Sequence, residues 1–239
     1  MLLAEGWLVH GCSRTMPRDL EHDRLLWFPL DVAARAATDH LEARLRFRTL
    51  DALIHCAGSQ EPIGQVGATT PDAWAEGIQT NLIGTYRVVY AALPALQGAE
   101  DARILLFSGG GAFNPRPYYS AYAAAKAGTV ALMETLAAEI TKNVTVNCVA
   151  PGFVPTPIHA PSVAAGLPVQ SDDGSGREMA QAVACVRHLL SEQATGLTGK
   201  TISAVHDDWR SITPERVAAL NASEVWTRTR VSAREGVLA

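Results

Sequence analysis

The residues best suited to acid–base chemistry are Tyr122 and Lys126, which are separated by three alanines. Residues four apart on a helix share one face, a single turn from each other. An ammonium group in that place stabilises phenolate and lowers the pKa of a tyrosine toward neutrality, as a general acid or base requires. Lys126 is one of three lysines in a chain with seventeen arginines. The pair is therefore a candidate catalytic unit, although the same spacing on an alanine-rich helix also arises by accident.

The segments around this pair alternate between short apolar runs and longer amphipathic ones, which is typical of strands joined by crossover helices. This pattern predicts an α/β fold with a mostly parallel sheet. Strands are expected at Trp7–Cys12, Leu26–Leu30, Ala52–Cys56, Arg103–Phe107, Val144–Val149 and Thr201–Val205. Helices are expected at Asp31–Phe47, Pro71–Gln97 (with Thr70 as its N-cap), Tyr118–Thr141, Glu178–Ser191 and Thr213–Leu220.

The length of 239 residues with 48% hydrophobic and 18% charged residues is typical of one globular domain, residues 1–239. A proline-rich irregular connection, residues 152–176, is expected to form a lid over the site. The segment 207–239 is expected to extend the domain, with a strand-like stretch at Val225–Val231 and with Trp209 and Trp226 packed against the core, the site or a neighbouring subunit.

The net charge of −4 argues against general nucleic-acid binding, which needs a basic face. No apolar run approaches the roughly 20 residues that span a membrane, and no membrane partner is expected. The four cysteines form no CxxC pair and no metal-ligand spacing, so free thiols and no metal site are expected. We expect a cytoplasmic protein.

Several motifs follow one another in a characteristic order. They are Asp31-Val32, His55-Cys56-Ala57-Gly58, Asn81, Tyr122-Ala123-Ala124-Ala125-Lys126, Val146-Asn147-Cys148-Val149-Ala150-Pro151-Gly152-Phe153-Val154-Pro155-Thr156 and the turn Gly196–Lys200. With these motifs the chain, from about Ala4 to Val205, resembles the short-chain dehydrogenase/reductase family. The resemblance implies a doubly wound, Rossmann-like sheet in a three-layer α/β/α arrangement and an oxidoreductase of NADP(H), or of NAD(H), acting on a small carbonyl or alcohol.

The resemblance also implies a role for each matching residue. Tyr122 would exchange a proton with the substrate oxygen, Lys126 would lower its pKa and hold the nicotinamide ribose, Asn81 would hold a water, and Ser108 would bind the substrate oxygen. The cofactor would contact Arg14, Asp31, Val32, Cys56, Ala57, Gly58, Tyr122, Lys126, Pro151, Gly152, Val154 and Thr156.

The serine is the first departure from the family pattern. The family most often places it thirteen residues before the tyrosine, where this chain has Gly109, and Ser108 lies fourteen before. The adaptable run Gly109–Gly111 would let Ser108 reach the site, or would offer backbone amides to an oxyanion instead. We favour Ser108. A second departure, His55-Cys56 in place of two asparagines, is treated as tolerated variation.

The third departure concerns the family's first strand and its glycine-rich phosphate loop, which have no counterpart in the sequence. That strand would lie between the strands at Trp7–Cys12 and Ala52–Cys56, so both would lose a neighbour. Two interpretations follow: the chain is a truncated family member, or it is a divergent one that binds no dinucleotide in the usual way.

The end of the strand at Trp7–Cys12 bears on the choice of cofactor. An arginine there attracts a 2′-phosphate, and Arg14 occupies this place, which favours NADP(H), unless it is an ordinary surface arginine. By family position the substrate pocket would be lined by Phe113, Arg116, Tyr118, Phe153 and the lid. Arg116 would either pair with a carboxylate or phosphate or be a solvated loop residue.

Two other functions remain open. The chain could be a non-catalytic or regulatory binding protein, which the absent phosphate loop favours, or a sugar-nucleotide epimerase or dehydratase built on the same tyrosine and lysine. The resemblance further implies a homodimer or homotetramer formed by the helices at Pro71–Gln97 and Tyr118–Thr141.

Overall fold

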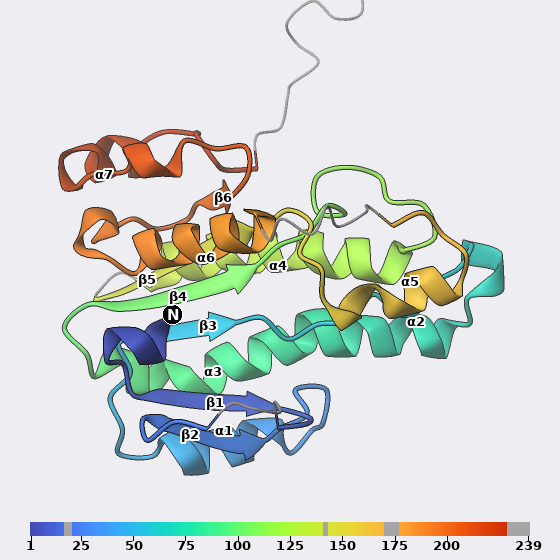
Figure 1. Ribbon diagram of the computed structural model, residues 1–239, viewed down its shortest axis with the longest axis horizontal. Coiled ribbons are helices and arrows are strands. Elements are labelled where there is room, and N and C mark those ends of the chain that lie inside the picture. Colours follow the sequence, from blue (N-terminus) through green and yellow to red (C-terminus); the bar gives the residue numbers. More distant parts are fainter. Residues whose placement is uncertain (17–20, 141–142, 170–176, 229–239) are drawn as a thin grey trace, which may run out of the picture.

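Parallel strands in two separate sheets form the middle layer of the computed structural model, which describes residues 1–16, 21–140, 143–169 and 177–228 (Figure 1). Strand β1 (Val9–Ser13) pairs with β2 (Leu25–Pro29). The larger sheet has the order β3-β4-β5-β6. Its strands are β3 (Ala52–His55), β4 (Ala102–Phe107), β5 (Val144–Ala150) and β6 (Thr201–Ser203). Every pairing is parallel, which confirms the predicted α/β class.

Helices cover the larger sheet on both faces. The helices are α1 (Ala37–Leu45), α2 (Pro71–Ile78), α3 (Gly84–Gln97), α4 (Ser120–Glu139), α5 (Ala160–Ala164), α6 (Arg177–Leu189) and α7 (Pro214–Asn221). Ile104 of β4 packs with α3 and α4, whereas the next residue, Leu105, packs with α6 and α7. Since successive strand residues face opposite ways, the two helix layers lie on opposite faces. No helix among the described residues is long and apolar enough to cross a membrane.

The predicted helix at Pro71–Gln97 is present, but it contains one wider turn. The Thr70 hydroxyl caps its start by accepting a hydrogen bond from Ala73 N at 3.3 Å. Between α2 and α3 the chain forms a π-helical turn, Gln79–Ile83. Such turns insert one residue into a helix and are common at functional sites.

Two predicted boundaries were wrong. Helix α1 begins at Ala37 and not at Asp31, because the Asp31 carboxylate accepts a hydrogen bond from Ala33 N at 2.9 Å and holds a non-helical turn. Residues 225–228 form turns and not the expected strand, and the rest of that stretch lies outside the described residues.

An opening separates β1 from β3, the strands at which the two sheets face each other. No backbone hydrogen bond among the described residues joins these strands, so each is an edge. A cavity of about 470 Å³ lies where they begin, lined by Glu5, Gly6, Trp7, Leu8, His10, Thr49, Leu50, Asp51 and Ala52. The sheet is thus divided at the place where the sequence lacks a counterpart of the family's first strand (Figure 1).

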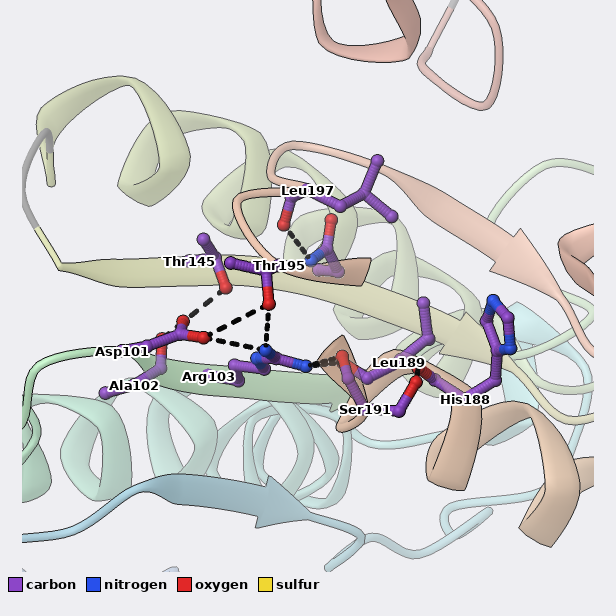
Figure 2. Close-up of polar contacts among 10 residues, drawn as sticks. Asp101, Ala102, Arg103, Thr145, His188, Leu189, Ser191, Thr195 and Leu197 are labelled. Atoms are coloured by element: carbon purple, nitrogen blue, oxygen red, sulfur yellow. Dashed lines mark hydrogen bonds and ion pairs between the residues drawn. The ribbon is translucent and has the colours of Figure 1, made fainter. Parts of the chain in front are cut away.

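The larger sheet is held to α6 by a buried arginine at the start of β4. Arg103 donates to Asp101 and to the Thr195 hydroxyl at 2.7 Å each, and to the backbone oxygens of Leu189 and Ser191 (Figure 2). Those oxygens belong to the end of α6 and the residues just after it, where helical carbonyls lack partners. The guanidinium therefore caps a helix and ties it to the sheet.

The segment after β6 packs onto the core, one of the three expected positions for its tryptophans. Trp209 is buried among residues of α6 and α7 and donates its indole N–H to Ala204 O at 3.0 Å. Trp226 packs against the same cluster, and its carbonyl accepts a hydrogen bond from Thr201 N at 2.7 Å. This part of the extension therefore stabilises the fold.

Candidate active site

Helix α4 presents Tyr122 and Lys126 side by side, as their spacing predicts. Both are buried, with 6% and 7% of their surface exposed. The Lys126 Nζ atom lies 5.7 Å from the centre of the Tyr122 ring and donates a hydrogen bond to Phe107 O at 2.8 Å. Because Phe107 ends β4, this bond fixes the lysine at the carboxyl edge of the larger sheet.

The π-helical turn brings Asn81 to the same place. Asn81 is fully buried and its amide nitrogen donates to the carbonyls of Gly77 and Ser59, at 2.9 Å each, while its oxygen accepts from Ser59 N at 3.0 Å. A Cβ atom at Gly58 would lie 2.9 Å from Asn81 Oδ1 and 3.8 Å from Lys126 Nζ. Gly58, Asn81 and Lys126, far apart in sequence, are therefore neighbours.

The glycine run after β4 lies directly against the tyrosine. A Cβ atom at Gly109 would lie 2.5 Å from the Tyr122 hydroxyl, so a serine at this position would displace the tyrosine. The Ser108 hydroxyl next to it is buried and has no hydrogen-bond partner among the residues that the structure describes. An unpartnered buried hydroxyl is costly, and its position suits a group that binds a ligand oxygen.

Burial and nearby charges shift the pKa values of both residues of the pair. Burial raises the pKa of Tyr122, and the nearby positive charge that opposes this shift is the guanidinium of Arg116. Burial also lowers the pKa of Lys126, which weakens its charged form. For Tyr122, burial therefore has a larger effect on the pKa than the opposing charge of Arg116.

The lid is attached to the loop after β3 by a chain of hydrogen bonds. The Ser162 hydroxyl donates to Gln60 Oε1 at 2.7 Å, and Gln60 Nε2 lies 3.3 Å from His159 Nδ1. His159 Nε2 lies 3.1 Å from Val154 O, and its ring lies 4.7 Å from that of Phe153. Gln60 and Ser162 are buried, so residues 152–169 of the predicted lid have a defined position, while the rest of the predicted lid, residues 170–176, lies outside the described residues.

The predicted cofactor residues form two groups. Tyr122, Lys126 and Gly58 lie together, and the chain leaves β5 through Pro151 and Gly152, whose φ of 81° suits glycine, toward Val154 and Thr156. Cys56 and Ala57 are exposed just after β3. Arg14 and Asp31 are exposed after β1 and β2, across the opening, while Val32 is buried against Gly84. No contact among the described residues joins Arg14 or Asp31 to Tyr122.

These two groups fit a dinucleotide unequally. The unpartnered Ser108 hydroxyl and the close approach of Gly58 to Asn81 and Lys126 suit the nicotinamide end. At the pyrophosphate end, the described residues offer no glycine-rich turn between a strand and a helix like those that bind phosphates. The described residues therefore fit the nicotinamide end of a dinucleotide better than its pyrophosphate end.

Two features were missed by sequence reasoning. They are the contact of the Arg116 guanidinium with the Tyr122 ring and the Gln60–His159 link. The first had a signal in sequence, because Arg116 stands six residues before Tyr122 in a loop after a predicted strand. The link joins segments 99 residues apart and has no local signal.

Comparison with known proteins identifies the family of this chain. The family model described as short chain dehydrogenase matches residues 7–165. Nodulation protein G of Rhizobium meliloti is 30% identical over 218 residues, 84% of this chain and 86% of that protein. The 3-oxoacyl-[acyl-carrier-protein] reductase FabG of Salmonella typhimurium is 31% identical over 166 residues, 66% of each chain. The chain therefore belongs to the short-chain dehydrogenase/reductase family of oxidoreductases.

Solved structures show the same fold. The aldohexose dehydrogenase of Thermoplasma acidophilum superposes with a TM-score of 0.70 at 23% identity, covering 84% of each chain. A short chain dehydrogenase from Escherichia coli CFT073, complexed with NADPH, superposes with a TM-score of 0.67 at 23% identity, covering 76% of this chain and 75% of that one. These structures confirm the predicted Rossmann-like architecture.

Proposed function

We propose that this protein interconverts a small carbonyl compound and the corresponding alcohol with NADP(H), using Tyr122 as the acid–base group. The observation that carries the proposal is the buried cluster at the carboxyl edge of the larger sheet, where Tyr122 and Lys126 meet Asn81 and Gly58. A buried phenol whose pKa lies above its ordinary value is protonated at neutral pH. It is thus ready to donate a proton to a carbonyl oxygen.

The remaining residues have distinct roles in this proposal. Lys126, fixed by Phe107 O, places a positive charge behind the ring and holds the nicotinamide ribose. Asn81 maintains the π-helical turn and holds a water near Lys126. The unpartnered Ser108 hydroxyl binds the substrate oxygen beside Tyr122.

The cofactor, when bound, supplies or accepts a hydride. Pro151, Gly152, Val154 and Thr156 would hold its nicotinamide end, and Cys56, Ala57 and Gly58 would lie along it. Asp31, Val32 and Arg14 would lie at the adenosine end, where the positive charge of Arg14 favours NADP(H) over NAD(H).

The first test combines binding and turnover. Calorimetry should show NADPH binding to the 239-residue chain, and NADPH oxidation should be followed with a panel of aldehydes and ketones. Tyr122→Phe should lower the rate about a thousandfold, since general acid catalysis contributes on that scale. Phe47→Leu, at an almost fully exposed side chain outside the proposed site and the proposed contact surface, is the control and should keep the wild-type rate.

Two results would oppose the proposal. Equal rates for the wild type and Tyr122→Phe on every carbonyl would exclude this tyrosine as the acid. If neither this chain nor a version extended upstream in its native reading frame binds NADPH or NADH, the non-catalytic binding protein is favoured instead.

We further propose that the protein is a homo-oligomer located in the cytoplasm. Large apolar side chains are exposed along α2, the π-helical turn and α3, which follow one another directly in the chain; they are Trp74, Ile83, Tyr86 and Tyr90. A second copy packed on this surface would bury them.

All four cysteines are free in the structure, which suits a reducing compartment.

A further inference from the structure

Arg116 lies in the loop between β4 and α4, with its guanidinium carbon over two aromatic rings. It is 4.3 Å from the centre of the Tyr119 ring and 5.5 Å from that of Tyr122. The loop itself is tied down, because Arg116 O accepts a hydrogen bond from Tyr119 N and Tyr118 O accepts one from Gly64 N. The positive charge is therefore held beside the proposed catalytic tyrosine.

This guanidinium has no anionic partner within the described part of the chain. Arg103, Arg187 and Arg228 each form an ion pair with a carboxylate, at 2.6 to 2.7 Å. No such pair is found for Arg116, and its side chain donates no hydrogen bond to a described residue. The contacts with the two tyrosine rings use the positive charge of the guanidinium and not its N–H donors, which stay available to a ligand.

We propose that Arg116 binds a carboxylate of the substrate, so that the enzyme acts on an oxo acid or hydroxy acid. This inference rests on the proposed function, because the Tyr122 hydroxyl marks the position of the reacting oxygen. Because Arg116 lies over the same ring, a substrate carboxylate bound to it would be only a few carbon atoms away from the reacting oxygen of the substrate. The fork of N–H groups matches the two oxygens of a carboxylate.

Binding of such an anion would also act on the tyrosine. Two positive groups face the Tyr122 ring, Arg116 from the loop and Lys126 from α4. In the free protein the charge of Arg116 lowers the pKa of Tyr122 against the effect of burial. A carboxylate paired with Arg116 would cancel part of this charge and raise that pKa. The substrate would then keep the phenol protonated for carbonyl reduction.

The turnover test uses carbonyl compounds matched in size. The probes are pyruvate with methyl pyruvate and levulinate with methyl levulinate, which differ in the distance between carbonyl and carboxylate. The wild type should prefer at least one acid over its ester by about tenfold or more in kcat/KM. Arg116→Gln should remove this preference and Arg116→Lys should restore part of it. Arg46→Gln is the control, because Arg46 also stacks on a ring, that of Phe47, which is exposed.

A second test needs no turnover. The pKa of Tyr122 is followed by NMR of protein labelled at tyrosine Cζ, with Tyr122→Phe used to assign the signal. Saturating levulinate or pyruvate should raise this pKa in the wild type and leave it unchanged in Arg116→Gln. Without ligand, the pKa should be higher in Arg116→Gln than in Arg46→Gln.

The outcomes separate this inference from the proposed function. Equal kcat/KM for acids and esters in the wild type, or a preference that survives in Arg116→Gln, would overturn the inference while carbonyl reduction stands. If no carbonyl compound is reduced, the proposed function fails and the titration decides alone. If neither acid then changes the Tyr122 signal, the proposed role of Arg116 is overturned.

Discussion

The four-stranded sheet and the two-stranded sheet are built from similar parallel strands but differ in what covers them. Ile104, Leu105 and Leu106 of β4 are almost completely buried, because helices lie on both faces. In β1 every residue is exposed or half-buried. Helix α1 covers one face of the β1–β2 sheet, where Phe28 and Leu41 pack together. The short helix Leu2–Glu5 is joined to α6 by an ion pair between Glu5 and Arg187.

This difference divides the site as well. Tyr122, Lys126, Asn81 and Ser108 all lie on or beside the larger sheet and its helices, where packing on both faces fixes their positions. Arg14 and Asp31 lie on the smaller sheet, which shares no strand pairing with the larger one. The reacting groups are therefore positioned by a well-packed core, and the residues proposed to select the cofactor depend on a separately attached unit.

The largest expected effect is the loss of Arg103, which would test the rigidity of the larger sheet. Arg103→Met removes the group that satisfies the Leu189 and Ser191 carbonyls and leaves buried acceptors without donors. We expect the free energy of unfolding to fall by about 3 kcal/mol. Urea denaturation followed by circular dichroism measures this.

The matched control is Arg24→Met in the smaller sheet. Arg24 is exposed and donates to the backbone oxygen of Gly6. We expect this change to cost less than about 1 kcal/mol. Similar losses of unfolding free energy in the two variants would show that the two sheets are equally well stabilised by their surroundings, contrary to the difference in packing described above.

A somewhat smaller effect is expected from His55, at the end of β3. Burial lowers the pKa of His55 to about 4, from 6.5 in the unfolded chain. Between these pH values the unfolded chain binds a proton and the folded protein does not, so stability is lost as the pH falls from 6.5 toward 4. At pH 4.5 the loss should be about 2 kcal/mol.

His55→Asn should remove this pH-dependent loss, because asparagine does not titrate. The measurement is the free energy of unfolding at pH 7 and pH 4.5 for both proteins, and the difference between the two losses isolates His55 from the other histidines. A loss of equal size in the variant would mean that His55 does not cause the acid sensitivity.

The sequence predicted most of the larger sheet and the placement of Tyr122 beside Lys126, since these follow local rules. The strand at Val144–Val149 and the cap at Thr70 are set by hydrophobic pattern and side-chain chemistry, and the Tyr122–Lys126 pair by helical spacing. The Gln60–His159 link and the effect of burial on the Tyr122 pKa could not be predicted. They depend on which distant segments meet, and on how much water the packing excludes around one side chain.

The smallest effect concerns the smaller sheet and rests on the proposed cofactor. Arg14 is exposed, so its attraction for a 2′-phosphate is screened by solvent and should contribute about 1 kcal/mol. Arg14→Gln should weaken NADPH binding about fivefold and leave NADH binding and stability unchanged, as measured by calorimetry and urea denaturation. Arg46→Gln, which removes one charge elsewhere, should change neither affinity. Equal loss of both nucleotides in Arg14→Gln would show that Arg14 positions the smaller sheet and does not select the cofactor.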